Sequence, residues 1–254
     1  LRVQHQPRHG SAAARNRGIA VSTADNVLFL GADILPDAHL LAHHRSVHHQ
    51  YPEETVGCLG FVTWDPLLPP TPFMVWLEHG GPQNAYGEIA GQHWVDPARY
   101  CYAANSSFKR SLLMSLGGFD ERRFRTYGWE DRDLGVRFAT RRGRLFYTSS
   151  ARAYHVHRHS VNSWALRQKF AGESFVTFCR IHPTRASIPQ SAIGWRYALR
   201  RFLYRSPVGT LLRVLARRAE ERWILPVVYR KVSGYVFTKS VHRASVENSR
   251  EETS

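Results

Sequence analysis

A short apolar run at residues 26–30, NVLFL, limits the fold class. A strand with no polar alternation is typical of a sheet that helices cover on both faces. An alanine-rich segment at residues 11–22 precedes the run, and we expect a helix there with Ser11 as its N-cap. Leucines and histidines at helical spacing follow Pro36. This alternation predicts an α/β fold in which Asp33 lies at the carboxyl end of the strand, where open α/β sheets bind ligands.

The remaining elements follow from similar patterns. We expect strands at residues 1–6 and 145–148 and helices at residues 105–116 and 130–142, with Gly117 and Gly118 closing the first of these helices. Residues 56–102 read as short strands and loops. From about residue 187 the chain is arginine-rich and amphipathic, and its polar end at residues 247–254 is expected to be disordered.

The charge of the chain restricts its partners. Its 254 residues carry 35 Lys and Arg against 20 Asp and Glu, a net charge of +15, which favours anionic partners such as nucleotide phosphates or anionic lipids. Cys58, Cys101 and Cys179 lie far apart and are expected to be reduced, buried thiols of a cytosol-facing protein. No apolar run is long enough to span a bilayer.

Three carboxylates stand within four residues in GWEDRDLGVRF, at Glu130, Asp131 and Asp133. Acidic residues in the first turn of a helix complement its dipole, and Asp133 can pair with Arg137 one turn later. Two adjacent ionised carboxylates repel each other, however, so a helix start explains Glu130 and Asp131 less well. The residues alone leave open whether Asp131 is a helix-start acid or a general base.

Several segments together resemble inverting family 2 glycosyltransferases of the GT-A fold. GGFDERRFRTYGWEDRDLGVRF is similar to the segment of that family that carries its catalytic base. SAAARNRGIA, VLFLGADILPDAHLLAHH, NSSFKRSLLMSLGGFDE and AYHVHRHS match further segments in the same order. The resemblance covers residues 1–183. It implies a GT-A-like, Rossmann-related mixed sheet flanked by helices.

The resemblance implies a role for nine residues. Asp131 matches the general base and Glu130 a residue that orients the acceptor or tunes that base. Asp33 and His155 match ligands of Mn²⁺ or Mg²⁺, with His157 as the alternative to His155, since residues 155, 157 and 159 would share one face of a strand. The expected substrate-binding residues are Arg15, Asn16, Asn105, Asp120 and Trp129.

The chain departs from the family pattern in two places. Gly31 and Ala32 stand where the Asp-x-Asp signature has acids, which leaves Asp33 alone. The first strand–helix units, which form the nucleobase pocket in the family, are not found. We therefore expect residues 1–186 to be the distal part of a GT-A catalytic domain and residues 187–254 to be a basic helical extension with a disordered tail.

The function implied is transfer of a sugar, with inversion, from a nucleotide-sugar donor to a hydroxyl of a glycan or lipid-linked acceptor. A catalytically inactive fragment and a basic nucleic-acid-binding protein are the alternatives, although no nucleic-acid recognition motif is evident. The segment 195–237 has the composition of an interfacial helix on anionic lipid, and equally that of a basic face over a packed core. The expected location is the cytoplasm, with peripheral attachment to the membrane.

Two further clusters have simpler interpretations. The histidines at positions 43, 44, 48 and 49 are expected to form a solvated helix face, because no acidic residue accompanies them as in known zinc motifs. Trp64, Trp76 and Trp94 could stack on sugar rings, but tryptophans at such positions more often belong to a core.

Overall fold

The computed structural model describes residues 3–79, 85–218 and 226–251. Contacts divide the chain into two compact units. The sheet unit comprises residues 1–69, 82–125 and 130–158, and the helical unit comprises residues 70–81, 126–129 and 159–254. The contacts therefore group residues 159–186 with the C-terminal helices, whereas the sequence led us to expect a boundary at residue 186. In the described part of the chain, no helix is long and apolar enough to cross a bilayer.

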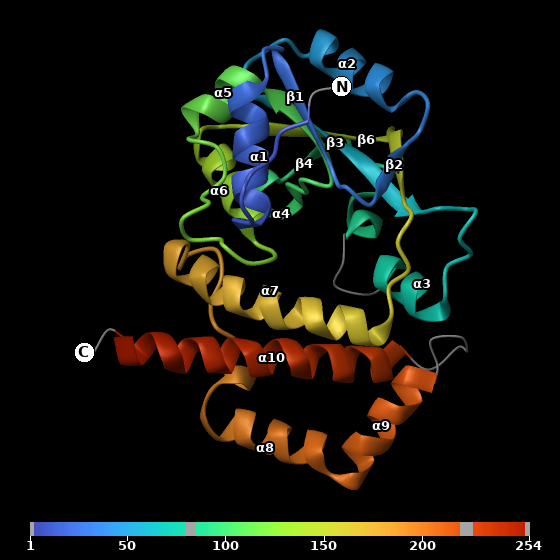
Figure 1. The fold of residues 1–254 in the computed structure, drawn as a ribbon, viewed down its shortest axis with the longest axis vertical. Coiled ribbons are helices and arrows are strands. Elements are labelled where there is room, and N and C mark those ends of the chain that lie inside the picture. The colour runs from blue at the N-terminus through green and yellow to red at the C-terminus, as the bar shows by residue number, and fades with distance from the viewer. Residues whose placement is uncertain (1–2, 80–84, 219–225, 252–254) are drawn as a thin grey trace. The chain divides into compact units, whose positions relative to one another are not determined.

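A six-stranded mixed sheet forms the centre of the sheet unit (Figure 1). Five strands follow the order β1-β5-β3-β6-β2, and β4 pairs with β6. Only β3 and β6 are parallel; the other pairs are antiparallel. The strands are β1 (Asn26–Leu30), β2 (Ile34–Pro36), β3 (Val56–Trp64), β4 (Trp94–Val95), β5 (Asn105–Lys109) and β6 (Arg144–His155).

Helices flank this sheet, which confirms the expected α/β class with a mixed sheet. They are α1 (Gly10–Val21), α2 (Leu40–Gln50), α4 (Pro97–Tyr100), α5 (Arg110–Ser115) and α6 (Glu130–Thr140), with a short 3₁₀ helix at Tyr86–Ile89. Phe29, Phe108, Phe119 and Phe138 are buried together in the core. Two pairs of rings pack edge to face. The ring centres of Phe29 and Phe119 are 5.2 Å apart, and those of Phe108 and Phe138 are 5.6 Å apart.

The helical unit contains α3 (Pro72–His79), α7 (Val161–Ile181), α8 (Gly194–Arg205), α9 (Pro207–Arg218) and α10 (Pro226–Glu251). A capping box between Ser160 and Ser163 begins α7. Helices α7 and α10 lie side by side (Figure 1). At Gly172 a side chain would meet Ser240, so the absence of a side chain there permits the two helices to approach closely. Ile181 ends α7, and a 3₁₀ turn at Gln190–Ala192 leads to α8.

Several expected elements differ from the structure. Residues 3–6 are not a strand, and residues 1–2 lie outside the described part. The helix expected at residues 105–116 is instead strand β5 followed by α5. Strand β1 is at the edge of the sheet and is only partly buried. The C-terminal tail, expected to be disordered, is helical as far as Glu251, and residues 252–254 lie outside the described part. The strand that carries His155 ends there, so residues 157 and 159 do not share a strand face with it.

Candidate active site

Helix α6 begins at Glu130, directly after a turn of unusual backbone conformation. Gly128 and Trp129 have φ values of 95° and 71°. The left-handed region is strained for a bulky residue such as Trp129, and such strain often accompanies a functional site. Within the helical unit, the Trp129 ring packs on Phe175 at 4.6 Å and on Phe178 at 5.0 Å. This packing supports the turn from which Glu130 and Asp131 follow in the chain.

Glu130 is held from helix α1. Its Oε1 accepts hydrogen bonds from Ser11 Oγ and Arg15 Nη1, both at 2.7 Å. The residue is only 5% exposed, and its Oε2 has no hydrogen-bond partner among the described residues. Ser11 therefore does not cap α1 as expected; His9 stands at the N-cap position and Ser11 serves the distant carboxylate. The buried charge of Glu130 is balanced by the guanidinium of Arg15.

Asp131 is different, since its side chain remains partly exposed. Burial raises the pKa of Asp131 to about 6, and the negative charge of Glu130 adds to this rise. Arg15 and Arg132 oppose the rise, as does the hydrogen bond that the Arg132 N–H donates to Asp131 Oδ1 at 2.8 Å. A carboxylate with a pKa near neutrality, accessible to solvent, has the properties of a general base.

The surroundings of Asp131 are aromatic. Its charge contributes to the raised pKa values of Tyr86, Tyr102 and Cys101, although burial is the larger cause in each. Tyr102 is half-buried and its hydroxyl accepts a hydrogen bond from the Ala85 N–H at 3.3 Å. No sequence pattern singled out Tyr86 or Tyr102, because only the folding of a distant segment brings them near α6.

Helix α4 packs tightly on the first turns of α6. A Cβ at Gly135 would lie 2.2 Å from the Pro97 carbonyl oxygen, so no larger residue fits at this crossing. Arg132 Nε donates a hydrogen bond to the Ala98 carbonyl at 3.0 Å. Asp96 caps α4 by accepting from the Ala98 N–H at 2.9 Å. These contacts fix the helix end that carries Asp131.

The structure confirms the predicted ion pair between Asp133 and Arg137. Arg137 Nε and Nη2 donate to Asp133 Oδ2 at 2.9 and 2.8 Å, and Arg137 Nη1 donates to the Leu116 carbonyl at 2.6 Å. The Asp133 side chain is buried at 2% exposure. The pair therefore ties α6 to the end of α5 and leaves Asp133 no access to substrate.

Asn16 and Asp120 stabilise the turn that contains Gly118 and Phe119. Asn16 Oδ1 accepts from the Phe119 N–H and Asn16 Nδ2 donates to the Phe119 carbonyl, both at 2.8 Å. Gly118 has a φ of 67°, and a Cβ there would lie 2.4 Å from Asn16 Oδ1. Asp120 accepts from the backbone N–H of Arg123 at 3.0 Å. Both side chains are thus engaged within the protein at positions expected to contact substrate.

Asn105 is fully buried in the sheet. Its Nδ2 donates to the carbonyl oxygens of Ala151 at 2.8 Å and Phe61 at 3.2 Å, and its Oδ1 contacts His44 Nε2 at 2.9 Å. The register of β3 and β6 shifts between Gly60 and Phe61, and the two carbonyls that Asn105 binds lie at this irregularity. The structure thus gives Asn105 contacts within the sheet.

Asp33 and His155 come together at the end of the sheet. Asp33 Oδ2 and His155 Nδ1 are 3.8 Å apart, and the Ile34–His155 pairing of β2 and β6 holds them there. The side chain of Asp33 is 39% exposed and that of His155 is 10% exposed. The ring of Trp64 lies 5.5 Å from that of His155. His157 is exposed.

These two residues fit a divalent cation as part of its ligand shell. Two ligand atoms that are each about 2.1 Å from one ion can be separated by up to about 4.2 Å, so the observed distance is compatible. No group of three or more His, Cys, Asp or Glu side chains suited to a metal occurs in the described residues. Further ligands would have to come from a bound substrate, as the oxygens of a diphosphate can provide.

The histidines of α2 are not a solvated face. His44 and His48 are buried, at 3% and 6% exposure, and both contact Ser107 Oγ. The sequence interpretation was wrong for these two because β5 supplies polar partners that an isolated helix does not reveal. Trp76 is buried, as tryptophans at such positions often are, and the centre of its ring lies 5.8 Å from that of Phe73, on which it stacks.

Sequence comparison finds two proteins that are similar to this chain. Over 199 residues it is 29% identical to the pre-mycofactocin glycosyltransferase of two Mycobacterium tuberculosis strains. The aligned part is 74% of this chain and 39% of each relative, so the chain spans about two-fifths of their length. This relationship confirms the resemblance to glycosyltransferases that the motifs indicated. No protein-family model matches the chain.

Two solved structures are similar in part. GalNAc-T7, crystallised with UDP, GalNAc and Mn²⁺, superposes with a TM-score of 0.45 at 14% identity, over 78% of this chain and 42% of that one. S. aureus TarS superposes with a TM-score of 0.44 at 13% identity, over 96% of this chain and 73% of that one. These similarities are too low to define the activity or the site.

Proposed function

We propose that the protein is an inverting glycosyltransferase of the GT-A type that moves a sugar from a nucleotide-sugar donor to a hydroxyl of a glycan or lipid-linked acceptor. The observation that carries the proposal is the carboxylate of Asp131, partly exposed and with its pKa raised to about 6. The relationship to curated glycosyltransferases supports the class of reaction. Glu130 cannot compete for the role, because Arg15 and Ser11 engage it.

In the proposed reaction, Asp131 accepts the proton of the acceptor hydroxyl as its oxygen attacks the anomeric carbon. The bond between that carbon and the phosphate oxygen breaks on the opposite face, and its electron pair leaves with the nucleoside diphosphate. Configuration at the anomeric carbon is therefore inverted. Asp131 afterwards releases the proton to solvent. A positioned base of this kind contributes about 10²–10⁴-fold to the rate.

We assign Asp33 and His155 to the divalent metal, Mn²⁺ or Mg²⁺, that this class of enzyme commonly uses. A bound cation would neutralise the charge that develops on the leaving diphosphate. The carboxylate of Asp33 and the imidazole of His155 suit that ion, and their separation of 3.8 Å permits both to bind it. With only two protein ligands, binding of the metal should depend on the diphosphate.

The role proposed for Arg15 changes with the geometry. Its guanidinium is engaged by Glu130 and lies 5.2 Å from the centre of the Phe119 ring. We assign Arg15 to holding Glu130 and, through its charge, to limiting the pKa of Asp131. Trp129 is assigned to supporting the turn before α6.

Replacing the base tests the proposal. The protein is incubated with a panel of nucleotide sugars and glycan acceptors, and release of nucleoside diphosphate is measured. The Asp131→Asn variant should retain donor binding but lose about 10²–10⁴-fold in turnover. Asp25→Asn serves as control because Asp25 is an exposed residue before β1. Turnover of Asp131→Asn within a few-fold of the unmodified protein would remove Asp131 from the role of base.

We further infer that the helical unit attaches to an anionic membrane surface, as found on the cytoplasmic side of cells. Large apolar residues on α8 are exposed, with Trp195 and Phe202 each at 70%. Trp195, Leu199 and Phe202 recur at helical spacing and so share one face. Arginines on the same helix provide attraction to anionic lipid. Residues 219–225 of the segment expected to bind lipid lie outside the described part.

A further inference from the structure

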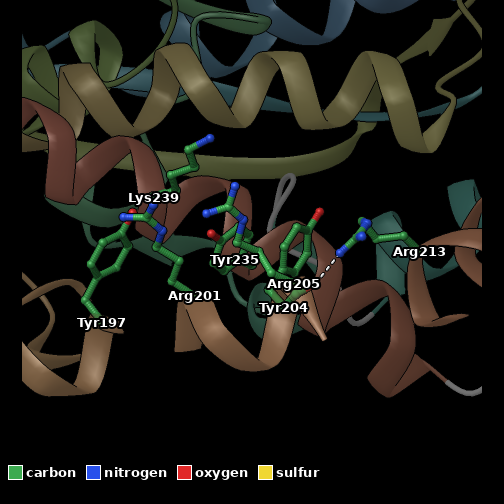
Figure 2. A pocket seen from close by; sticks show the side chains of 7 residues that line it. All are labelled: Tyr197, Arg201, Tyr204, Arg205, Arg213, Tyr235 and Lys239. Carbon is green, nitrogen blue, oxygen red and sulfur yellow. Dashed lines mark hydrogen bonds between the residues drawn. The ribbon is translucent and has the colours of Figure 1, made fainter. Parts of the chain in front are cut away.

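The helical unit contains a basic pocket of about 440 Å³ (Figure 2). Four cationic side chains line it, from Arg201, Arg205, Arg213 and Lys239. The remaining lining comes from Tyr197, Tyr204 and Tyr235, so no carboxylate belongs to the described wall of the pocket. Helices α8, α9 and α10 each contribute to it.

The pocket residues occupy defined helix faces. Tyr197, Arg201 and Arg205 recur every four residues along α8, which places them on one face. Tyr235 and Lys239 have the same spacing on α10. Among the exposed apolar residues of α8, Trp195 and Leu199 lie on the opposite face, because each is two residues, or about 200° of helix rotation, from the nearest members of this series. The pocket is thus distinct from the apolar face to which we assign membrane contact.

Contacts within the unit fix part of the wall. Arg213 Nη2 donates to Thr210 Oγ1 at 2.8 Å, and Nη1 donates to the Tyr204 carbonyl. The Arg213 guanidinium lies 4.4 Å from the centre of the Tyr204 ring, which stacks on Tyr235 at 3.6 Å. Tyr197 stacks on His242 at 3.8 Å. One cation and three aromatic rings are therefore held in place before any ligand binds.

The other three cations are available to a ligand. Among residues 3–79, 85–218 and 226–251, no carboxylate forms an ion pair with Arg201, Arg205 or Lys239. Like charges gathered around one opening repel each other, and an anion placed between them relieves that repulsion. One guanidinium group can donate two parallel hydrogen bonds to two oxygens of a phosphate. A phosphate has enough oxygens to accept from several cations at once, whereas a carboxylate has only two.

We propose that this pocket binds a phosphorylated ligand, with the phosphate held by Arg201, Arg205 and Lys239 and an organic group placed against the tyrosines. The volume is larger than a phosphate needs and lies within the range of small-molecule sites, about 300–1,000 Å³. Aromatic walls suit an apolar or sugar-like moiety attached to the phosphate. The source of the phosphate is either a soluble phosphate ester or the headgroup of a lipid.

The test compares two variants of equal charge. Arg201→Gln/Lys239→Gln removes one arginine and one lysine from the pocket. Arg230→Gln/Lys231→Gln removes the same charges from exposed positions of α10 that do not line it. Circular dichroism establishes that both variants are folded. Binding of inorganic pyrophosphate is measured by calorimetry, and binding to phosphatidylcholine vesicles with and without phosphatidic acid is measured by cosedimentation.

We expect the pocket variant to bind the phosphorylated probe at least about tenfold more weakly and the control variant to bind it normally. A loss seen with pyrophosphate identifies a soluble phosphate ligand as sufficient. A loss confined to vesicles that contain phosphatidic acid identifies a lipid headgroup. Equal weakening in both variants would show that general charge attracts the probe, and unchanged binding in the pocket variant would show that the pocket does not hold phosphate; either result overturns the proposal.

Discussion

Asp131 and Glu130 are neighbours in sequence, but the fold gives them different chemical environments. Arg15 and Ser11 of α1 donate hydrogen bonds to Glu130, whereas Asp131 keeps access to solvent and its pKa is raised to about 6. The sequence motif indicated both carboxylates. It could not indicate which of them would be engaged, because Ser11 and Arg15 lie more than 100 residues away and their contacts depend on the finished fold.

The raised pKa of Asp131 predicts the acid side of the pH–rate profile. Asp131 acts as a base only when ionised, so kcat/KM should be constant above neutrality and fall about tenfold per pH unit as the pH decreases below about 6. The Coulombic effect of Glu130 raises this pKa. Glu130→Gln should therefore shift the acid limb to lower pH, while its amide oxygen can still accept from Ser11 and Arg15.

The measurement is kcat/KM against pH for the unmodified protein, Glu130→Gln and Glu247→Gln. Glu247 is an exposed residue of α10 that pairs with Arg243, and its replacement should leave the profile unchanged. A shift of the limb to higher pH in Glu130→Gln, or no shift at all, would be incompatible with the coupling between the two carboxylates.

At the scale of elements, the sequence predicted most helices well and β5 badly. The segment NSSFKRSLLMSL has polar residues first and leucines later, which suits a single amphipathic helix. The structure instead makes Asn105–Lys109 a strand between β1 and β3. Two of its buried polar side chains, Asn105 and Ser107, find partners in His44 and His48 of α2. A pairing between such distant segments leaves no local pattern in the sequence.

The contacts between α2 and β5 form a directed chain of hydrogen bonds. Lys109 Nζ can only donate, so His48 Nδ1 accepts at 2.9 Å and His48 Nε2 donates to Ser107 Oγ at 2.7 Å. The Ser107 hydroxyl then donates to His44 Nδ1 at 2.8 Å, and His44 Nε2 donates to Asn105 Oδ1 at 2.9 Å. Each histidine is neutral in this chain, since protonation would place a second donor against a donor.

This chain predicts a loss of stability in mild acid. Burial, with help from the charge of Lys109, lowers the pKa of His48 from 6.5 to about 4, and burial also lowers the pKa of His44. The unfolded chain therefore takes up protons first, and stability falls as the pH decreases from 6.5 towards 4. For His48 alone the loss is about 1.4 kcal/mol per pH unit within that window.

Urea unfolding at pH 7 and pH 5 measures this loss. His48→Gln should be less stable than the unmodified protein at pH 7 but should lose less stability between the two pH values. His49→Gln changes an exposed histidine of the same helix and should behave as the unmodified protein. Equal pH dependence in all three proteins would show that His48 is not responsible.

For the molecule as a whole, the net charge of +15 and the exposed apolar residues of α8 both affect how the protein would attach to a membrane. Charge alone attracts a protein to anionic lipid, but salt screens that attraction over about 10 Å at 0.1 M ionic strength. Burial of apolar side chains in the interface is not screened. Attachment through α8 should therefore require both anionic lipid and the apolar face.

We predict that the protein cosediments with vesicles containing phosphatidylserine and not with pure phosphatidylcholine vesicles. Trp195→Ser/Phe202→Ser should weaken this binding by at least about tenfold, since fully burying one large apolar side chain contributes about 1.5–3 kcal/mol. Leu67→Ser/Met114→Ser is the control, because both residues are also exposed, at 86% and 54%, but belong to the sheet unit. If the two variants bind equally well, α8 does not contact the bilayer, and the attraction arises from the net charge of the molecule.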